Sequence, residues 1–263
     1  MKTRIISGFM MAPLLVLVYL GGYWLMAAAF AVGVIGLHEF YKGFEASGAK
    51  PCKPLGYAAA IALYGLHLAA PGADHLIVMW MAAIVIASMI YGFDVEKRKL
   101  EDMTSTLMGI MYTVFLSFHI VLIDETSPQM IWLVFLAAFG TDIMAYFTGM
   151  AFGKHKLCPH LSPKKSVEGA IGGVLGSMIL CAIYGYFFMP DSVWVSLAIG
   201  FFGSIIAQLG DLSASAFKRQ MGIKDYGNLI PGHGGILDRF DSVMFTGPAV
   251  YYCPMIFASV ALI

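Results

Sequence analysis

The chain has 263 residues, of which 59% are hydrophobic and only 12% are charged, and its basic and acidic side chains balance to a formal net charge of zero. A soluble domain carries about 25% charged residues, so the composition excludes an ordinary soluble protein and predicts an all-α, polytopic integral membrane protein. Without a net positive charge, no nucleic acid is expected as a partner.

Nine apolar runs are candidates to span a bilayer, which takes about 20 residues with about 17 as a lower limit. They are residues 5–21, 23–40, 55–71, 75–93, 104–123, 130–150, 168–189, 192–210 and 242–262. Gly21 and Gly22 alone separate the first two runs, which predicts a tight helical hairpin. The first run imitates a secretory signal, but an uncleaved span is favoured because further long runs follow. We expect about four spans in an N-terminal region, 1–103, and about five in a C-terminal catalytic region, 104–263.

The basic residues give an independent test of this count. With nine spans, one side of the membrane receives the N-terminus and the loops near 41–54, 94–103, 151–167 and 211–241, and these segments contain all 16 Lys and Arg residues. The charged residues of the opposite loops are Asp74, Asp124, Glu125 and Asp191. Loops with excess Lys and Arg stay in the cytoplasm. The pattern therefore predicts a cytoplasmic N-terminus, with loops 151–167 and 211–241 facing the cytoplasm from a bacterial inner membrane.

Three aspartates flank the loop 211–241. Asp238 and Asp241 stand three positions apart, so they share one face if that segment is helical, and Asp211 closes the preceding run. Converging carboxylates suit a hard divalent cation such as Mg²⁺, which takes one or two protein carboxylates plus substrate phosphates. The alternative is that Asp238 or Asp241 caps a helix N-terminus. Three acids beside a glycine-rich turn favour the metal site.

Glycines and basic side chains fill the same loop. Residues 231–235 read Pro-Gly-His-Gly-Gly, and their backbone N–H groups are suited to bind an anion, although a plain turn has the same composition. His233 is a candidate for phosphate contact or proton transfer. The basic candidates for holding a phosphate chain are Lys218, Arg219, Lys224 and Arg239. Ordinary cytoplasmic charge that fixes topology is the alternative, above all for Lys218 and Arg219.

A second polar cluster occupies residues 162–169, in the other polar loop. Ser166 is expected to N-cap the seventh span, with Glu168 in its first turn. Lys164 and Lys165 then stand at a helix N-terminus, where an anionic group would bind. The sequence equally allows these two lysines to serve only as a positive-inside anchor.

Asp142 lies inside the sixth run, and an acid within a span is costly and marks function by default. Its alternative role is a hydrogen bond that locks two helices, with Thr141 or Tyr146 as the partner. Glu39, at the end of the second run, is expected to be structural or interfacial. Three histidines on apolar runs are expected to be packed and satisfied: His38, His67 and His119. The four cysteines are far apart and predict neither a disulfide framework nor a zinc site.

The stretch 215–241 resembles the signature of phosphatidate cytidylyltransferases, also called CDP-diacylglycerol synthases. The matching positions are Ser215, Lys218, Arg219, Lys224, Asp225, His233, Gly234, Gly235, Asp238, Arg239 and Asp241. Residues 142–149 (D-x-x-A-Y-F-x-G) and 162–169 (S-P-K-K-S-x-E-G) are also similar to the family, which more often has Thr at the position of Ser166. Length and span count agree, so the resemblance covers the whole chain and is strongest from residue 140 to 245.

The resemblance implies transfer of the cytidylyl group of CTP to phosphatidic acid, giving CDP-diacylglycerol and pyrophosphate in phospholipid biosynthesis. It also implies Mg²⁺ held by Asp211 and Asp238, a second, monovalent cation such as K⁺, and a homodimer among membrane lipids. The residues expected to act in catalysis are Asp211, Asp238, Asp241, Lys218, Arg219, Arg239 and His233. The residues expected to bind substrate are Lys164, Lys165, Ser162, Ser166, Lys224, Asp225, Gly234, Gly235 and Asp142.

Other classes of membrane protein stay open. A CTP-dependent lipid kinase of the polyprenol or phytol type would transfer the γ-phosphate and release CDP. A transporter or an inactive membrane scaffold is compatible with Asp142 and with short, glycine-interrupted spans, although the polar cluster lies in a loop rather than at mid-membrane. A CDP-alcohol phosphatidyltransferase is disfavoured because its D-G-x-x-A-R…D-x-x-x-D pattern is absent from the sequence.

Overall fold

A computed structural model describes residues 15–229 and 234–260, and most of them are helical. The first half of the chain contains α2 (Gly22–Ala46), α3 (Lys53–Ala69), α4 (Asp74–Tyr91), α5 (Leu100–Gly109), the π-helical segment η1 (Ile110–Phe115) and α6 (Leu116–Thr126). The second half contains η2 (Pro128–Met130), α7 (Ile131–Phe152), β1 (Lys156–Cys158), β2 (Ser162–Ser166), α8 (Val167–Phe188), η3 (Pro190–Ser192), α9 (Val193–Gln220) and α10 (Leu237–Val260).

Six helical segments in the described part of the chain are long and apolar enough to cross a membrane. They are Gly22–Ala46, Asp74–Tyr91, Leu100–Thr126, Pro128–Phe152, Val167–Phe188 and Pro190–Gln220. This finding confirms the prediction of an all-α membrane protein. α3 and α10 coincide with two more of the nine predicted runs but are not among the six, and the run 5–21 lies mostly outside the described residues.

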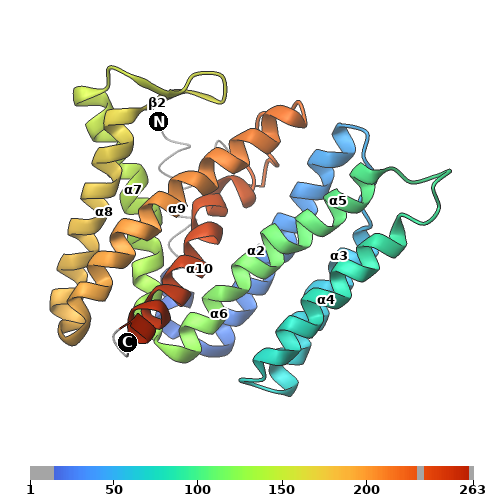
Figure 1. Ribbon diagram of the computed structural model, residues 1–263, viewed down its shortest axis with the longest axis horizontal. Helices are drawn as coiled ribbons and strands as arrows, with labels where there is room; N and C mark the ends of the chain where they lie inside the picture. The colour runs from blue at the N-terminus through green and yellow to red at the C-terminus, as the bar shows by residue number, and fades with distance from the viewer. Residues whose placement is uncertain (1–14, 230–233, 261–263) are drawn as a thin grey trace.

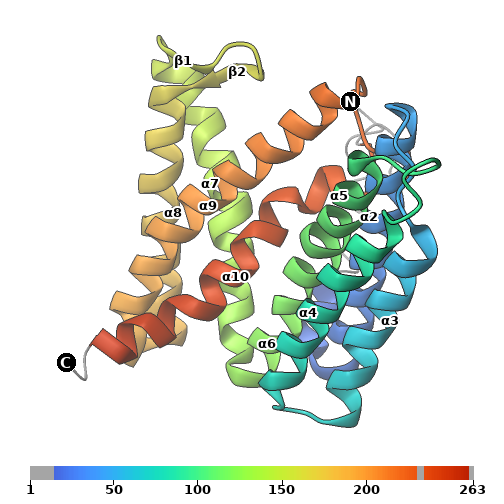
Figure 2. The same cartoon turned by 45° about the vertical axis from the view of Figure 1, so that its right-hand side comes forward.

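The polar loops gather at one end of the helices. In Figure 1, α7, α8 and α9 lie on one side of the molecule, α3 and α4 lie on the other, and α10 runs between them. Both views place the β1–β2 hairpin, the end of α9, the start of α10 and the α4–α5 loop at one end (Figures 1 and 2). The α3–α4 and α8–α9 turns lie at the opposite end. The loops therefore alternate between the two ends in the order that the basic residues predict.

The predicted loop 151–167 contains a small antiparallel hairpin, in which Lys156 pairs with Ser166 and Cys158 pairs with Ser162. Its strands have only three and five residues, too few for an alternating pattern to reveal them in the sequence. Ser166 ends the hairpin and begins α8, because its Oγ accepts a hydrogen bond of 3.1 Å from the Gly169 N–H. The predicted N-cap is thus confirmed.

α9 continues through Gln220, although the apolar run ends at residue 210, so the first part of the predicted loop 211–241 is helical. Hydropathy marks the end of an apolar run, whereas a helix continues until its backbone is turned away. Gly222 provides that turn with a positive φ of 70°, and the Ile223 N–H donates to the Lys218 carbonyl at 2.9 Å. The chain is thereby directed back towards α10.

An aromatic cluster fixes α2 against α9. Phe40 is fully buried, and its ring lies edge-on to Phe217 of α9 at 5.3 Å and to Tyr112 of η1 at 5.4 Å. Edge-to-face aromatic pairs at this separation add to the energy of burial. A helix from the first quarter of the chain is therefore held next to the C-terminal polar segment.

Candidate active site

α9 and α10 approach each other closely at Gly210. A β-carbon on Gly210 would lie 2.9 Å from the β-carbon of Phe245 and 3.0 Å from the carbonyl oxygen of Asp241, which leaves no room for a side chain. This contact places Asp211, the next residue on α9, beside the first turns of α10. Asp211 and Lys218 are seven positions apart, about two helical turns, so they share one face of α9.

Asp238 lies at the start of α10 and is almost completely enclosed by donors. Its Oδ1 accepts from the Lys218 Nζ at 2.8 Å, and its Oδ2 accepts from the Tyr226 N–H at 2.8 Å and the Gly235 N–H at 3.0 Å. Gly234 has a φ of 84°, and a β-carbon there would lie 2.7 Å from Oδ2 of Asp238. The glycines are therefore required for the backbone to fold around this carboxylate.

Asp211 forms an ion pair with Lys165, which β2 carries across from the hairpin. Both side chains are half-buried. Burial lowers the pKa of the Lys165 ammonium, and the nearby Asp142 and Asp241 carboxylates act in the opposite direction by raising it. The structure thus brings the two sequence clusters, 162–169 and 211–241, into one site.

A cavity of about 340 Å³ opens beside this ion pair between α7, α8 and the hairpin. Its polar lining comes from Asp142, Lys164, Lys165, Ser166 and Gln208, and its apolar lining includes Tyr146 and Met150. Asp142, the acid within a span, therefore faces a polar cavity rather than closed helix packing. A cavity with lysines at one end and apolar walls suits an anionic group attached to a lipid.

Asp241 is buried and one turn beyond Asp238, as the spacing predicts. Its Oδ1 accepts from the Ser242 N–H at 2.7 Å and the Ser242 Oγ at 3.2 Å. Arg239 is half-buried and lies within electrostatic range of Asp142. Asp241 and Arg239 of α10 therefore both lie within electrostatic range of Asp142, which lines the cavity.

In the described part of the chain, the side chains of other predicted residues form no hydrogen bond or ion pair with the carboxylates of the site. Arg219 in the last turn of α9, and Lys224 and Asp225 in the loop that follows, are exposed. Ser162 begins β2 at the far end of the strand from Ser166. His233 lies outside the described residues, so its predicted role stays a prediction.

Glu39, for which the sequence predicts a structural or interfacial role, has its carboxylate beside the site at the start of α10. Glu39 is 6% exposed, and it accepts hydrogen bonds from the Ile236 N–H at 3.1 Å and the Leu237 N–H at 2.8 Å. These partners are 197 and 198 positions away in the chain. No local motif surrounds Glu39, and its only signal in the sequence is a single acid at the end of an apolar run.

The carboxylates of the site are of the kind that binds Mg²⁺. Among the described residues, no three or more His, Cys, Asp or Glu side chains gather into a complete protein cage for a metal. Mg²⁺ does not need one, because it is usually bound by one or two carboxylates together with substrate phosphates and water. Asp211 and Asp238 each hold a lysine ammonium, so both carboxylates already bind positive charge in this site. Asp211 and Asp238 are carboxylates, the kind of side chain that Mg²⁺ prefers as a ligand.

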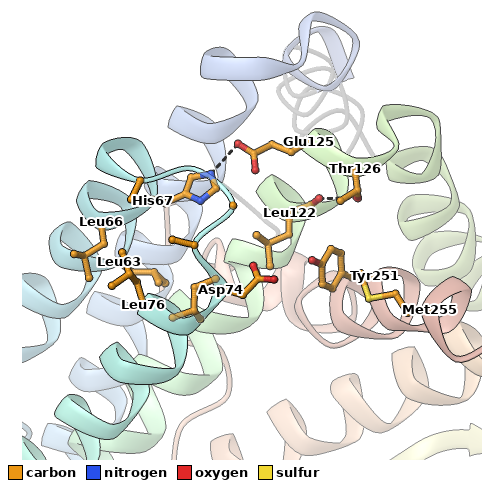
Figure 3. Close-up of a pocket in the computed structure, with 14 residues that line it drawn as sticks. Leu63, Leu66, His67, Asp74, Leu76, Leu122, Glu125, Thr126, Tyr251 and Met255 are labelled. Carbon is orange, nitrogen blue, oxygen red and sulfur yellow. Dashed lines mark hydrogen bonds and ion pairs between the residues drawn. The ribbon is translucent and has the colours of Figure 1, made fainter. Parts of the chain in front are cut away.

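A second cavity, of about 310 Å³, lies at the opposite end of the helices (Figure 3). His67 pairs there with Glu125 at 2.9 Å, and the labelled Asp74 and Tyr251 also line the cavity. The packed and satisfied role predicted for His67 is confirmed, but the packing predicted for His38 is wrong because that side chain is exposed, and His119 is packed with its Nε2 lacking a hydrogen-bond partner among the described residues. This cavity is separated from the lysine–aspartate site by the length of the helices.

The fold and the site together define a polytopic membrane protein with paired aspartates and lysines at one end. A family model described as "Cytidylyltransferase family" matches residues 2–257. The chain belongs to this family, which is a family of nucleotidyltransferases.

Curated relatives carry a more specific name. The chain is 34% identical to the phosphatidate cytidylyltransferase of Staphylococcus haemolyticus (strain JCSC1435) over 251 residues, which cover 94% of each chain. It is 33% identical, over the same length and share of each chain, to that of Staphylococcus epidermidis (strain ATCC 12228 / FDA PCI 1200). It is 36% identical to that of Staphylococcus aureus (strain COL) over 176 residues, 65% of this chain and 68% of the relative.

Proposed function

We propose that the protein transfers the cytidylyl group of CTP to phosphatidic acid, giving CDP-diacylglycerol and pyrophosphate. The observation that carries this proposal is the joining of two lysine–aspartate pairs, Lys165–Asp211 and Lys218–Asp238, beside a cavity with both polar and apolar walls. The site thus offers cations for a phosphate chain next to a lateral space for a lipid. The names of the relatives support the same pair of substrates.

The reaction is a single displacement at phosphorus. A phosphate oxygen of phosphatidic acid attacks the α-phosphorus of CTP and forms a new P–O bond. The bond from the α-phosphorus to its bridging oxygen breaks, and pyrophosphate leaves with those electrons. The attacking phosphate is already ionised near neutral pH, so the site needs no strong general base. The main barrier is the repulsion between two anions, which positioning and positive charge reduce.

The residues of the site match this requirement. Lys165 and Lys218 are held at fixed places by their aspartates, from which they are able to pair with phosphate oxygens. The acyl chains of the lipid stay in the bilayer, and its phosphate enters the cavity lined by Asp142 and Lys164 from the side. Arg239, half-buried on the same side, adds a forked cation near the reacting groups.

We assign Asp211 and Asp238 as the residues that hold Mg²⁺. Held by these two residues, Mg²⁺ would supply positive charge that favours the substrate phosphates and the leaving pyrophosphate. A second, monovalent cation such as K⁺ is part of the same proposal, and so is a homodimer.

We further propose nine spans, with the N-terminus and the active site in the cytoplasm of a bacterial cell. Cys158 of β1 provides a test because it lies at the active-site end and is partly exposed, whereas Cys181 and Cys253 are buried. A membrane-impermeant thiol reagent should label Cys158 in inside-out vesicles and leave it unlabelled in right-side-out vesicles. The opposite result would reverse the orientation.

Detergent-purified protein incubated with CTP, phosphatidic acid and Mg²⁺ tests the reaction. CTP labelled in the cytosine ring should yield labelled lipid, and pyrophosphate should appear in equal amount. Release of labelled CDP with transfer of the γ-phosphate to a lipid would instead establish a CTP-dependent lipid kinase. Uptake of substrate without CTP turnover would establish a transporter.

A further inference from the structure

The N-terminus of α10 is shared by two carboxylates from opposite ends of the chain. The first backbone N–H groups of a helix have no partner within the helix, so they need acceptors from elsewhere. Glu39 accepts those of Ile236 and Leu237, while Asp238 accepts those of Gly235 and Tyr226. The two carboxylates thereby divide the N–H donors of residues 235–237 between them, and Asp238 also binds the Tyr226 N–H of the preceding loop.

Within the described residues, this division leaves Oδ1 of Asp238 without a backbone donor, and it binds the Lys218 ammonium instead. Because Glu39 satisfies the helix terminus, Oδ1 of Asp238 is directed to Lys218 rather than to the backbone. Both carboxylates are also stabilised by the positive end of the α10 dipole. If Glu39 were lost, the Ile236 and Leu237 N–H groups would lose their acceptor, and the start of α10, which carries Asp238, would no longer be held in place.

The backbone around Glu39 is built to approach it closely. A β-carbon on Gly227 would lie 2.5 Å from Oε1 of Glu39, so any larger residue there would displace the carboxylate. Phe40, the next residue on α2, packs against Phe217, the neighbour of Lys218 in sequence, and against Tyr226, whose N–H donates to Asp238. α2 is therefore anchored to the site next to the glutamate.

We propose that Glu39 is a positioning residue for the reaction: it fixes the start of α10 so that Asp238 presents its carboxylate to Lys218 and to Mg²⁺. The inference rests on the proposed function, since it assigns Glu39 a part in that reaction. A positioning role for Glu39 differs from a purely structural cap in one respect. Loss of Glu39 must change the Mg²⁺ concentration that the protein needs for half-maximal activity.

Glu39→Gln tests the proposal, because glutamine keeps the size of the side chain but offers one acceptor and turns an NH₂ group towards a backbone donor. We expect kcat to fall about 10- to 100-fold, the range that a small misplacement of reacting groups produces. We expect the KM for phosphatidic acid to stay within about twofold, because the lipid cavity does not contact Glu39. The Mg²⁺ concentration for half-maximal activity should rise severalfold.

Asp102 offers a matched control. It is 2% exposed and accepts from the Lys50 N–H at 2.6 Å and the Lys99 N–H at 3.0 Å, so it too is a buried carboxylate that binds two backbone donors, at the start of α5. Asp102→Asn should lower the melting temperature by as much as Glu39→Gln while leaving the Mg²⁺ response unchanged. If Asp102→Asn shifts the Mg²⁺ response equally, or if Glu39→Gln retains both kcat and that response, the positioning role is refuted.

Two further variants keep the test decisive if Glu39→Gln does not fold. Glu39→Asp retains the charge but withdraws the carboxylate by one methylene, and Gly227→Ala displaces an unaltered Glu39. Both should reproduce the shift in the Mg²⁺ response, and normal responses in both would overturn the proposal. The stabilisation of each variant by Mg²⁺ alone, measured as a change in melting temperature, gives a readout without turnover. An absence of pyrophosphate release by the wild type would refute the proposed function, and this second readout would still decide the role of Glu39.

Discussion

Lys218 on α9 and Asp238 on α10 form an ion pair of 2.8 Å in which the two side chains are only 13% and 2% exposed. Removing two charges from water is costly, and an apolar pair of the same size is often at least as stabilising. Stabilisation of the contact between α9 and α10 therefore does not by itself explain this buried ion pair. Its position beside a second lysine–aspartate pair is better explained by chemistry on phosphates.

Asp238→Asn should lower turnover about 100-fold or more, since the substitution keeps the shape of the side chain but removes the charge that holds Lys218 and the proposed Mg²⁺. The measurement is pyrophosphate release by purified protein, with the amount of folded protein checked by size-exclusion chromatography. Asp94→Asn is the control, because Asp94 pairs with Lys97 at 3.0 Å on the exposed surface. It should retain activity within about twofold, as expected for an exposed pair. Near wild-type activity of Asp238→Asn would contradict the metal assignment.

Lys218→Met should lower the free energy of unfolding by about 3 kcal/mol, because it leaves the carboxylate of Asp238 buried without its cation. Lys97→Met, in the exposed pair, should change it by about 0.5 kcal/mol. Denaturant titration in detergent provides both values. Equal losses in the two variants would show that Asp238 is hydrated rather than enclosed.

Gly210→Ala should separate α9 from α10, because its β-carbon would meet Phe245 and the carbonyl of Asp241. We expect a loss of stability of about 1–3 kcal/mol, typical of overpacking, together with a fall in activity as Asp211 moves from α10. Gly65→Ala in α3 is the control, because a β-carbon there meets nothing within 4 Å. Its effect should stay within about 1 kcal/mol, the difference in helix propensity. Full activity of Gly210→Ala would show that the spacing of these helices does not set the site.

Much of the candidate site could be predicted because its residues are close in sequence. The i and i+3 spacing of Asp238 and Asp241 and the capping role of Ser166 follow from local backbone geometry, and the structure confirms both. The alternation of loops between the two ends follows from the distribution of Lys and Arg among the loops. Each of these signals can be read from a short stretch of sequence or from a count over the whole sequence.

Long-range contacts could not be predicted in this way. Glu39 is joined to Ile236 and Leu237 by the packing of α2, which no spacing encodes. Lys165 reaches Asp211 only because the unpredicted hairpin carries it to the side of α9. The predicted run ends at residue 210, whereas α9 continues to Gln220, because hydropathy reports where a helix leaves the apolar phase and not where the helix ends.

Removal of divalent cations with EDTA should abolish turnover, and added Mg²⁺ should restore it. Asp211→Asn should then need a higher Mg²⁺ concentration for half-maximal activity, because one of the two proposed carboxylate ligands is lost. Asp94→Asn again serves as the control and should follow the wild-type curve. Unchanged Mg²⁺ dependence in Asp211→Asn would remove this residue from the metal site and leave it as the partner of Lys165 alone.

The alkaline side of the pH profile should report on Lys165. Because burial lowers the pKa of this ammonium, it loses its proton at a lower pH than an exposed lysine does, and kcat/KM should fall as the pH rises through that value. The substrate phosphates are already ionised there, so they do not contribute to the fall.

Lys165→Arg keeps its charge throughout, since arginine stays protonated over the accessible pH range. The variant should therefore lose activity only at higher pH, even if its maximal rate is reduced. Lys53→Arg, in the partly exposed pair with Glu45 at 2.7 Å, should leave the profile unchanged. An identical alkaline limb in the wild type and Lys165→Arg would show that Lys165 does not act as a cation in the reaction.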